Sequence, residues 1–460
     1  MSGPLDDLGA VHFIGIGGAG MSGIARIMLA SGVPVSGSDA KDSAAVAELR
    51  GLGARVFIGQ AAENLADAAT VVVSTAIKAS NPELAAARQR GLKILHRSEA
   101  LAATMAQDAV VAVAGTHGKT TTTSMITVVL REAGLDPSFA IGATVPALGV
   151  NAAHGTGKIF VAEADESDGS FLNYRPQLEI ITNAEPDHLD HYGTAEAVMQ
   201  AFTDFIALLP GDGTLVACAD DPGSAGLAAA AAARGTRVLR YGRAASAEIR
   251  LLGDFLEFSG QRHELRLAVP GEHNRLNAAA AFAAAVELGV APSLAISSLG
   301  TFTGAARRFE LKGESSGVRV FDDYAHHPTE LTAALTAART VAAGHRVLVL
   351  FQPHLFSRTR EFAQEFGAAL DLADLAVVLD IYPAREEPLP GVTSELITAT
   401  AERAEYTADP QRAIERIVEQ AGPGDIVLTI GAGDVTQYGA VLVETLASRA
   451  EGEQRYADGS

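Results

Sequence analysis

Residues 115–121 of the chain, Gly-Thr-His-Gly-Lys-Thr-Thr, form a glycine-containing turn between two apolar stretches. The two glycines permit a tight turn whose backbone N–H groups can approach phosphate oxygens. Lys119 would reach the outer phosphates of a nucleotide, and the hydroxyl of Thr120 would complete the oxygen shell of a magnesium ion. The pattern is shorter than the usual phosphate loop, because Val113 stands where its first glycine would fall. The alternative is an ordinary strand-to-helix turn with a solvated lysine.

Two clusters of polar residues further along the chain could hold magnesium. Each follows a short apolar run that is typical of a buried strand. An acid directly after such a strand, downstream of a phosphate loop, is what a magnesium site requires, so Glu163 is the candidate ligand. His188 could bind a second metal ion through a neutral ring nitrogen, with Asp187 and Asp190 orienting the ring. The alternative is that both clusters are solvated surface loops.

A second glycine loop lies near the N-terminus, where residues 15–20 read Gly-Ile-Gly-Gly-Ala-Gly and fit the dinucleotide-binding pattern. Asp39 stands where that fold places the acid that binds a ribose hydroxyl, although it could also be a solvated loop acid. On these residues alone, an NAD-dependent oxidoreductase is the first interpretation. The same loop could hold the diphosphate of another nucleotide, because glycine backbone and a helix N-terminus recognise phosphate rather than nicotinamide. Residues 71–75, Val-Val-Val-Ser-Thr, predict a further strand that ends in hydroxyl groups.

Three later segments carry amides, imidazoles and acids. Residues 271–278 open an alanine-rich helix, and the amide of Asn274 either presents a donor and an acceptor to an adenine edge or only caps this helix. Residues 322–328 and 352–358 follow predicted strands and read Asp-Asp-Tyr-Ala-His-His-Pro and Gln-Pro-His-Leu-Phe-Ser-Arg. We expect these two clusters to share the phosphate site, because its loop has no local cation other than Lys119 to neutralise transition-state charge.

The apolar patterns around these motifs predict an α/β protein. Val110–Val113 is typical of a strand buried on both faces, and the helix after the phosphate loop has an apolar stripe. Strand and helix patterns alternate again in the last third of the chain, at 318–321, 328–339, 346–351, 359–370, 375–381 and 426–430. This alternation predicts a parallel sheet. At roughly 150 residues per domain the chain should form about three domains.

We therefore expect three consecutive domains. The first, residues 1–107, is predicted to be Rossmann-like and to contain the N-terminal glycine loop. Residues 108–308 are expected to form a central parallel sheet of the P-loop ATPase type. The remaining residues, 309–460, are expected to form a second Rossmann-like domain.

Composition excludes several classes of protein. The net charge of −20 argues against nonspecific binding to nucleic acid or to an anionic membrane, so local groups must hold any anionic ligand. Cys218 is the only cysteine, which excludes an internal disulfide and a thiolate metal cluster. No apolar stretch is long enough to span a bilayer, and the first residues lack the features of a cleaved signal. These features predict a cytoplasmic protein that is not inserted in a membrane.

Seven ordered motifs, spread over all three predicted domains, resemble those of the Mur ligase family. They are residues 15–23, 115–121, 163–168, 185–191, 273–278, 307–309 and 322–328. The resemblance implies an enzyme of peptidoglycan precursor synthesis that uses ATP and Mg²⁺ to join a carboxylate to an amine. It is greatest to the branch of the family in which the carboxylate of UDP-N-acetylmuramate forms an acyl phosphate that L-alanine then attacks. A branch that recycles a preformed peptide onto the same sugar nucleotide is the nearest alternative, and a nicotinamide enzyme would not need the second phosphate loop.

The resemblance also implies roles for single residues. The catalytic positions that it implies are Lys119, Glu163, His188, Arg308 and Asp323, and the metal ligands are Thr120, Glu163 and His188. The residues implied to contact ATP are Gly115, Thr116, His117, Gly118, Lys119, Thr120, Thr121, Asn274, Asn277, Arg308 and Asp323. The implied substrate contacts are Gly17, Gly18, Gly20, Asp39 and Ser74 for the UDP-sugar, and Tyr324, His326, His354 and Arg358 for the amino acid.

The chain differs from the family pattern at two points. Ligases that add later residues use a carbamylated lysine at the second magnesium, but no lysine lies between Lys158 and Lys312, which agrees with the alanine-adding branch. Leu355 stands where the family often has arginine, so Arg358 would have to orient the amino acid alone. His326 and His354 are both candidates for the group that accepts the proton of the ammonium.

Overall fold

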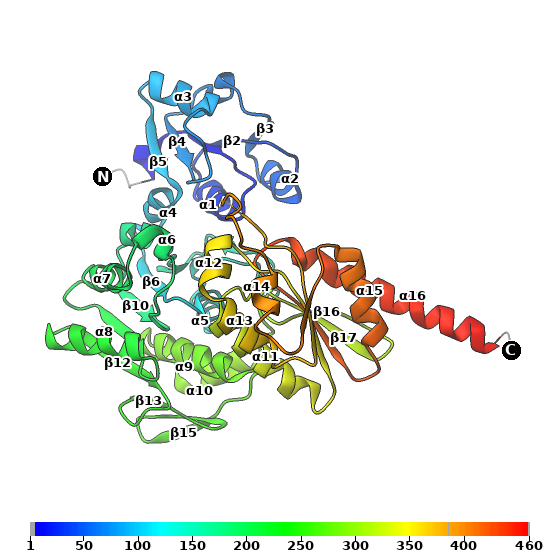
Figure 1. Ribbon diagram of the computed structural model, residues 1–460. Helices are drawn as coiled ribbons and strands as arrows, with labels where there is room; N and C mark the ends of the chain where they lie inside the picture. Colours follow the sequence, from blue (N-terminus) through cyan, green and yellow to red (C-terminus); the bar gives the residue numbers. More distant parts are fainter. Residues whose placement is uncertain (1–4, 385, 459–460) are drawn as a thin grey trace. The chain divides into compact units, whose positions relative to one another are not determined.

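The computed structural model describes residues 5–384 and 386–458, apart from the side chains of residues 6, 190 and 450–458. The chain forms two compact units, unit 1 of residues 1–267 and 275–303, and unit 2 of residues 268–274 and 304–460. Three sheets, of five, ten and six strands, consist mainly of parallel strands with helices between them (Figure 1). The predicted α/β class is therefore confirmed. The domain boundaries after residues 107 and 308 stay a prediction.

The first sheet of unit 1 contains the N-terminal glycine loop. Its strands are β1 (Val11–Ile14), β2 (Val35–Asp39), β3 (Arg55–Ile58), β4 (Thr70–Val73) and β5 (Lys93–His96). Their order is β3-β2-β1-β4-β5, and all pairings are parallel. The connecting helices are α1 (Ala19–Ala30), α2 (Ala44–Gly51), α3 (Pro82–Gln89) and α4 (Arg97–Met105). This Rossmann-like order has a switch point between β1 and β4, where ligands of open α/β sheets bind.

Helix α1 packs closely on the second sheet of unit 1. A side chain at Gly23 would place its Cβ 3.0 Å from the Cβ of Ala152, in strand β8 (Ala152–Ala153). Arg26 donates hydrogen bonds from the same helix to Asn151 and to the carbonyl of Ala152. The glycine-rich motif of residues 15–23 therefore also serves packing, because Gly23 lets the helix backbone approach the second sheet.

The second sheet has ten strands in the order β15-β14-β13-β12-β11-β10-β6-β9-β7-β8. Its strands besides β8 are β6 (Ala109–Ala114), β7 (Ser138–Ala140), β9 (Ile159–Glu163), β10 (Leu178–Ile181), β11 (Thr214–Cys218), β12 (Arg237–Gly242), β13 (Ile249–Leu252), β14 (Phe255–Phe258) and β15 (Gln261–Glu264). The helices are α5 (Lys119–Glu132), α6 (Leu189–Tyr192), α7 (Ala195–Ile206), α8 (Pro222–Ala233), α9 (Glu272–Glu287) and α10 (Pro292–Gly300). The sheet is parallel from β7 to β13, and only β8, β14 and β15 are antiparallel to their neighbours.

The sheet of unit 2 has the order β16-β17-β21-β18-β19-β20. Its strands are β16 (Glu310–Ser315), β17 (Val318–Asp323), β18 (Val347–Phe351), β19 (Leu375–Val378), β20 (Ala404–Tyr406) and β21 (Ile426–Ile430). The helices are α11 (Pro328–Ala342), α12 (Phe356–Glu361), α13 (Ala363–Leu370), α14 (Glu395–Thr398), α15 (Pro410–Gln420) and α16 (Tyr438–Asp458).

One sequence expectation for unit 2 was wrong, and one strand, β16, was not predicted. Strand β16 runs antiparallel to β17, because Ser316 and Gly317 both have positive φ angles and form a two-residue hairpin turn. The single helix predicted over residues 359–370 is two helices that meet at Phe362, whose φ of −114° and ψ of 22° interrupt the helical backbone. The other unit 2 pairings are parallel as predicted.

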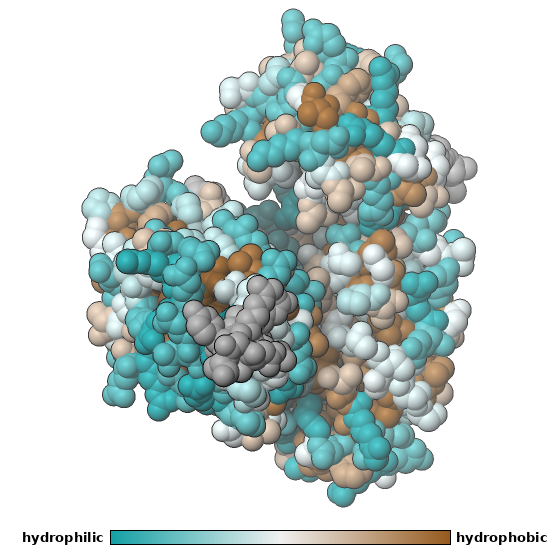
Figure 2. Space-filling model, turned by 90° about the vertical axis from the view of Figure 1, so that its right-hand side faces the viewer, coloured by the Kyte–Doolittle hydropathy of each residue, from teal (hydrophilic) through white to brown (hydrophobic). Residues whose placement is uncertain are grey.

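The face of the molecule in Figure 2 is mainly hydrophilic, and its apolar residues are scattered in small groups. Among the described residues, no helix has both the length and the apolar character that a membrane crossing needs.

Glu179 is an ionisable residue inside the core of unit 1. It lies in β10 with no solvent exposure, and in register with Ala112 and Leu215. Neither of its carboxyl oxygens has a hydrogen-bond partner among the described residues. Burial therefore raises the pKa of Glu179 well above its usual value, so the folded protein holds this side chain protonated.

We expect the Glu179→Gln variant to gain stability over the parent protein as the pH rises. The carboxyl of the unfolded chain loses its proton near pH 4.5, whereas the folded protein retains it, so the parent loses roughly 1.4 kcal/mol of unfolding free energy per pH unit above that value. The loss ends when the pH passes the raised pKa. Urea unfolding at pH 5 and pH 8 would measure the difference, with the exposed Glu63→Gln as control. A difference that does not change with pH would show that Glu179 is not buried as an acid.

Candidate functional site

The phosphate loop connects β6 to α5 and depends on two glycines. Gly115 has a φ of +132°, and a Cβ there would lie 2.1 Å from the hydroxyl oxygen of Thr182. Gly118 has a φ of +81° directly before the helix, and a Cβ there would lie 2.6 Å from Oδ1 of Asn277. No L side chain fits at either position, so the loop backbone can adopt this path only with glycine.

The loop is fixed to the end of strand β10 by hydrogen bonds. The hydroxyl of Thr182 donates to the carbonyl of His117 at 2.6 Å, and Oδ1 of Asn183 accepts from the N–H of His117 at 2.8 Å. Thr116 is held through Glu185, whose N–H donates to the Thr116 hydroxyl at 2.9 Å. The loop is therefore preorganised before any ligand arrives. Thr182 is a residue that sequence reasoning missed, although its place directly after a buried strand could have indicated it.

The predicted polar clusters meet at one edge of the sheet. Strand β6 pairs with β9 and with β10, and the register sets Val113 beside Glu163 and Ala114 beside Ile181. The carboxyl ends of all three strands therefore lie together. This arrangement brings both polar clusters to the phosphate loop, as the sequence analysis expected.

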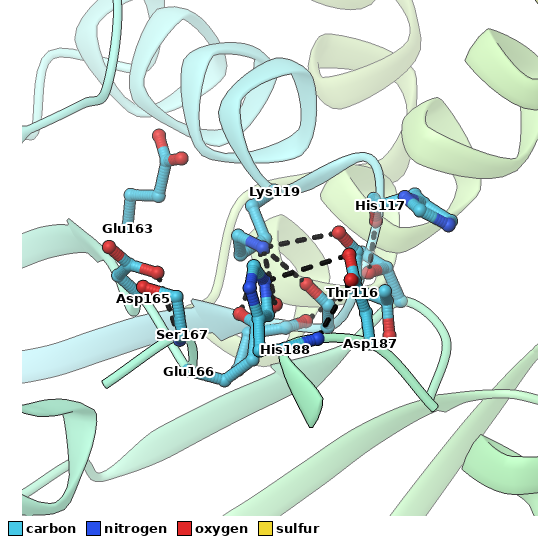
Figure 3. A network of polar contacts seen from close by, with 12 residues as sticks. Thr116, His117, Lys119, Glu163, Asp165, Glu166, Ser167, Asp187 and His188 are labelled. Carbon is cyan, nitrogen blue, oxygen red and sulfur yellow. Dashed lines mark hydrogen bonds and ion pairs between the residues drawn. The ribbon is translucent and has the colours of Figure 1, made fainter. Parts of the chain in front are cut away.

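Lys119 is surrounded by oxygen atoms. Its Nζ donates to the carbonyl of Gly115 at 2.7 Å and lies 2.8 Å from Oε2 of the buried Glu166. Figure 3 shows Lys119 and Glu166 side by side. Burial alone would lower the pKa of Lys119, but the Glu166 carboxylate and its acidic neighbours raise it. The lysine is therefore a fixed positive charge at the N-terminus of α5. Glu166 is a second residue that sequence reasoning did not single out.

Two predicted magnesium ligands contact each other. The hydroxyl of Thr120 donates to Oε1 of Glu163 at 2.9 Å, and the N–H of Gly142 donates to Oε2 of the same carboxylate at 2.6 Å. A carboxylate and a hydroxyl are the hard oxygen ligands that Mg²⁺ prefers. The pair fits a magnesium ion beside the phosphate loop.

His188 contacts the same Glu166 carboxylate as Lys119. Its Nε2 is 3.5 Å from Oε1 of Glu166 and 3.7 Å from Oδ2 of Asp187. Burial would lower the pKa of His188, but the two carboxylates outweigh burial and raise it. A metal ion at this ring would have to displace a proton. The side chain of Asp190, the other residue expected to orient the ring, is outside the described side chains.

In the N-terminal loop, Asp39 contacts the glycine backbone. Its Oδ2 accepts a hydrogen bond from the N–H of Gly17 at 2.8 Å, so it is not simply a solvated loop acid. Gly18 and Gly20 are exposed at the start of α1, and Ser74 directly follows β4. These residues lie at the switch point of the first sheet, where the predicted UDP-sugar contacts would have to be.

The two asparagines of α9 differ in their surroundings. Asn277 is buried in unit 1, where its side chain lies against Gly118 of the phosphate loop. Asn274 belongs to unit 2 and donates from Nδ2 to the carbonyl of Pro270 at 2.6 Å. The helix begins at Glu272, so Asn274 lies inside the first turn and is not the N-cap. The capping alternative for Asn274 was therefore wrong.

In unit 2, the predicted nucleotide contact Asp323 holds the backbone on both sides of it in the chain. Its carboxylate accepts hydrogen bonds from the N–H groups of Phe309 and Ala325, each at 2.8 Å. Burial raises the pKa of Asp323 to about 6, although the positive charge of Arg308 opposes this shift. The Arg308 guanidinium lies over the ring of Tyr324, 5.1 Å from its centroid.

Three of the four residues predicted to receive the amino acid form a row of rings in unit 2. Tyr324 contacts His326 edge to face at a centroid distance of 5.2 Å, and His326 contacts His354 at 5.8 Å. Tyr382, which the sequence analysis did not identify, stacks on His354 at 5.9 Å. Arg358 is buried on the short helix α12, one turn after Leu355.

Comparisons with known proteins match nearly the whole chain. Three family models cover consecutive parts, described as Mur ligase family, catalytic domain (residues 10–109), Mur ligase middle domain (113–285) and Mur ligase, glutamate ligase domain (307–433). A Renibacterium salmoninarum protein named UDP-N-acetylmuramate–L-alanine ligase is 68% identical over 459 residues, which cover 98% of this chain and 99% of that protein. The chain belongs to the Mur ligase family.

Solved structures of Mur ligases agree with this assignment. The UDP-N-acetylmuramate-alanine ligase of Thermotoga maritima has a TM-score of 0.78 and 29% identity, covering 96% of this chain and 99% of its own. A murein peptide ligase of Psychrobacter arcticus has a TM-score of 0.69 and 26% identity, covering 95% of this chain and 98% of its own. The family resemblance and the three-domain α/β fold are confirmed. The roles of single residues in this Mur ligase remain proposals.

Proposed function

We propose that this Mur ligase joins L-alanine to UDP-N-acetylmuramate and converts ATP to ADP and phosphate, in cytoplasmic synthesis of peptidoglycan precursors. The observation that carries the proposal is 68% identity, over nearly full length, to a protein named for that reaction. The preorganised phosphate loop supports the use of ATP. The interpretation of the N-terminal loop as an NAD site was wrong, because relatives that match nearly the whole chain are named as ligases. The same loop geometry can hold the diphosphate of a UDP-sugar.

In the first proposed step, a carboxylate oxygen of the sugar nucleotide attacks the γ-phosphorus of ATP and ADP leaves. Both reactants are anions, so the protein must supply positive charge where they meet. Lys119 supplies a fixed charge at the loop, and its protonated state follows from its contact with Glu166. Mg²⁺ held by Thr120 and Glu163 would neutralise further phosphate charge.

In the second proposed step, the amine of L-alanine attacks the acyl carbon and phosphate leaves. The amine must first lose a proton, and His326 and His354 are the candidate acceptors because they lie together in unit 2. Nδ1 of His326 is 3.1 Å from Oε2 of Glu330, so this carboxylate can orient the ring. Arg358 is proposed to hold the alanine carboxylate.

Phosphate release is the direct test of this function. The protein should release phosphate from ATP when UDP-N-acetylmuramate and L-alanine are both present, and much less with either substrate alone. A murein peptide ligase is the second candidate, because one solved structure of that name shares the fold at 26% identity. Faster release with a preformed tripeptide than with L-alanine would favour that candidate and overturn the proposal.

We expect the enzyme to need magnesium but no modified lysine, since no lysine lies between Lys158 and Lys312. Removal of carbon dioxide should leave the rate unchanged. The His188→Ala variant should need roughly 10-fold more magnesium or more, at least the effect of losing an outer-shell partner of a metal. In the parent protein the magnesium requirement should rise as the pH falls through the raised pKa of His188, because the protonated ring binds no metal.

Initial rates with and without dissolved carbon dioxide would check the first expectation, that no modified lysine is needed. Magnesium titrations of the initial rate would check the second, that His188→Ala needs more magnesium. His191→Ala is the matched control, because His191 is the exposed histidine three residues further on. Rescue of a degassed enzyme by bicarbonate would contradict the first expectation. An equal magnesium requirement in the His188 and His191 variants would contradict the second.

A further inference from the structure

Arg97 lies between the N-terminal glycine loop and the acidic segment of residues 165–168. It is the first residue of α4, and its Nη1 is 3.2 Å from the position that a Cβ of Gly20 would occupy at the start of α1. On its other side, Nη2 lies 3.4 Å from Oδ2 of Asp165 and 4.0 Å from Oδ2 of Asp168. One guanidinium thus faces both the N-terminal glycine loop and the acidic segment beside Lys119.

This position matters because the chain is acidic. A net charge of −20 means that a diphosphate at the N-terminal loop needs a local cation. The first N–H groups of α1 favour an anion there but carry only partial charge. Arg97 brings a full charge to the same place, and its side chain is 32% exposed, so a ligand can reach it.

The contacts of Arg97 with the two aspartates are exchangeable. Both are long, and Asp165 is 42% exposed, so water screens the attraction. A guanidinium pairs more strongly with a phosphate group through two parallel hydrogen bonds than with a distant, hydrated carboxylate. A diphosphate arriving at α1 would therefore compete successfully for this side chain.

We propose that Arg97 binds the diphosphate of the sugar nucleotide, and so ties the N-terminal loop to the acidic segment that follows Glu163. The inference rests on the proposed function, because it assumes a UDP-sugar at the N-terminal loop. It adds a substrate-binding residue that none of the glycine motifs contains.

A purely structural role for Arg97 is the competing explanation. Helix α4 is also fixed through Ser98, whose hydroxyl accepts a hydrogen bond at 2.9 Å from Asn173, in the segment between β9 and β10. Arg26 provides a matched control, because it joins α1 to the same region through Asn151 and lies 2.7 Å from Glu48. The Arg26→Met variant removes the same charge, and Gly20 has no contact with Arg26 among those described.

The experiment measures binding by calorimetry to the full-length parent protein and to Arg97→Met, Arg97→Lys and Arg26→Met. The ligands are uridine, UDP, UDP-N-acetylglucosamine and UDP-N-acetylmuramate. Arg97→Met should weaken the three diphosphate ligands by a similar factor, roughly 10- to 100-fold, the range for one charge-assisted contact. Uridine affinity and the KM for ATP should stay unchanged. The affinity of Arg97→Lys for these ligands should lie between those of the parent and Arg97→Met. Arg26→Met should bind them like the parent.

Four results would overturn the inference. If Arg97→Met binds only UDP-N-acetylmuramate more weakly, Arg97 contacts the muramoyl carboxylate and not the diphosphate. Equal weakening of uridine, or the same losses in Arg26→Met, would assign it to structure only. Unchanged binding in Arg97→Met, by a parent enzyme that ligates alanine, would refute the inference and leave the proposed function intact. A parent that binds UDP in an Arg97-dependent way but does not ligate alanine would refute only the proposed function.

Discussion

The Lys119→Ala variant is expected to fold normally and to lose roughly 100-fold or more of its ligase rate, the scale for removing one preorganised electrostatic contact to a transition state. The reason is the position of Nζ, at the N-terminus of α5 and 2.7 Å from the carbonyl of Gly115. Initial rates of phosphate release would measure the loss. Most of it should appear in kcat, because charge on the transferred phosphoryl group is greatest during the reaction.

Two comparisons separate this effect from damage to the fold. Lys93→Ala removes the same side chain from an exposed position on β5 and should keep the parent rate. Thermal unfolding of Lys119→Ala should show an intact protein, although Glu166 loses its ammonium partner. Near-normal turnover by a stable Lys119→Ala protein would show that residues 115–121 do not bind the phosphates of ATP.

The second large effect is expected at Arg358. We expect Arg358→Ala to raise the KM for L-alanine by roughly 100-fold, since a two-bond contact between guanidinium and carboxylate is lost. ATP affinity should change little. Leu355 cannot compensate, because its aliphatic side chain carries neither a charge nor a hydrogen-bond donor. Initial rates at varied alanine concentration, with ATP and sugar nucleotide saturating, would give kcat and the KM for L-alanine.

The buried position of Arg358 requires a second variant. Arg358→Lys keeps a positive charge but not the planar fork, so its KM should lie between those of the parent and Arg358→Ala. Arg360→Met, at an exposed position of the same helix, is the control for helix α12. If stable Arg358 variants keep the parent KM for alanine, the amino acid is bound elsewhere.

The sequence was enough for features that depend on short stretches of chain. Strand β21 begins and ends at the predicted residues, and the phosphate loop lies between a buried strand and a helix as expected. Such features follow from apolar periodicity and from the backbone freedom of glycine, which act over a few residues. The break between α12 and α13 at Phe362 escaped this reasoning, because no proline or glycine marks it.

Contacts between distant segments were decided by the tertiary structure. Glu166 pairs with Lys119 across 47 residues, Asn277 lies against Gly118, and Arg97 faces Gly20. No local pattern ranks Glu166 above the other acids of its segment, since all of them look equally able to meet a cation. By itself the sequence determined which segments carry the chemistry, because motif residues and their flanking strands are adjacent in the chain. Only the packing of strands and helices decided which charges meet, because electrostatic pairing depends on distances that the register of β6, β9 and β10 sets.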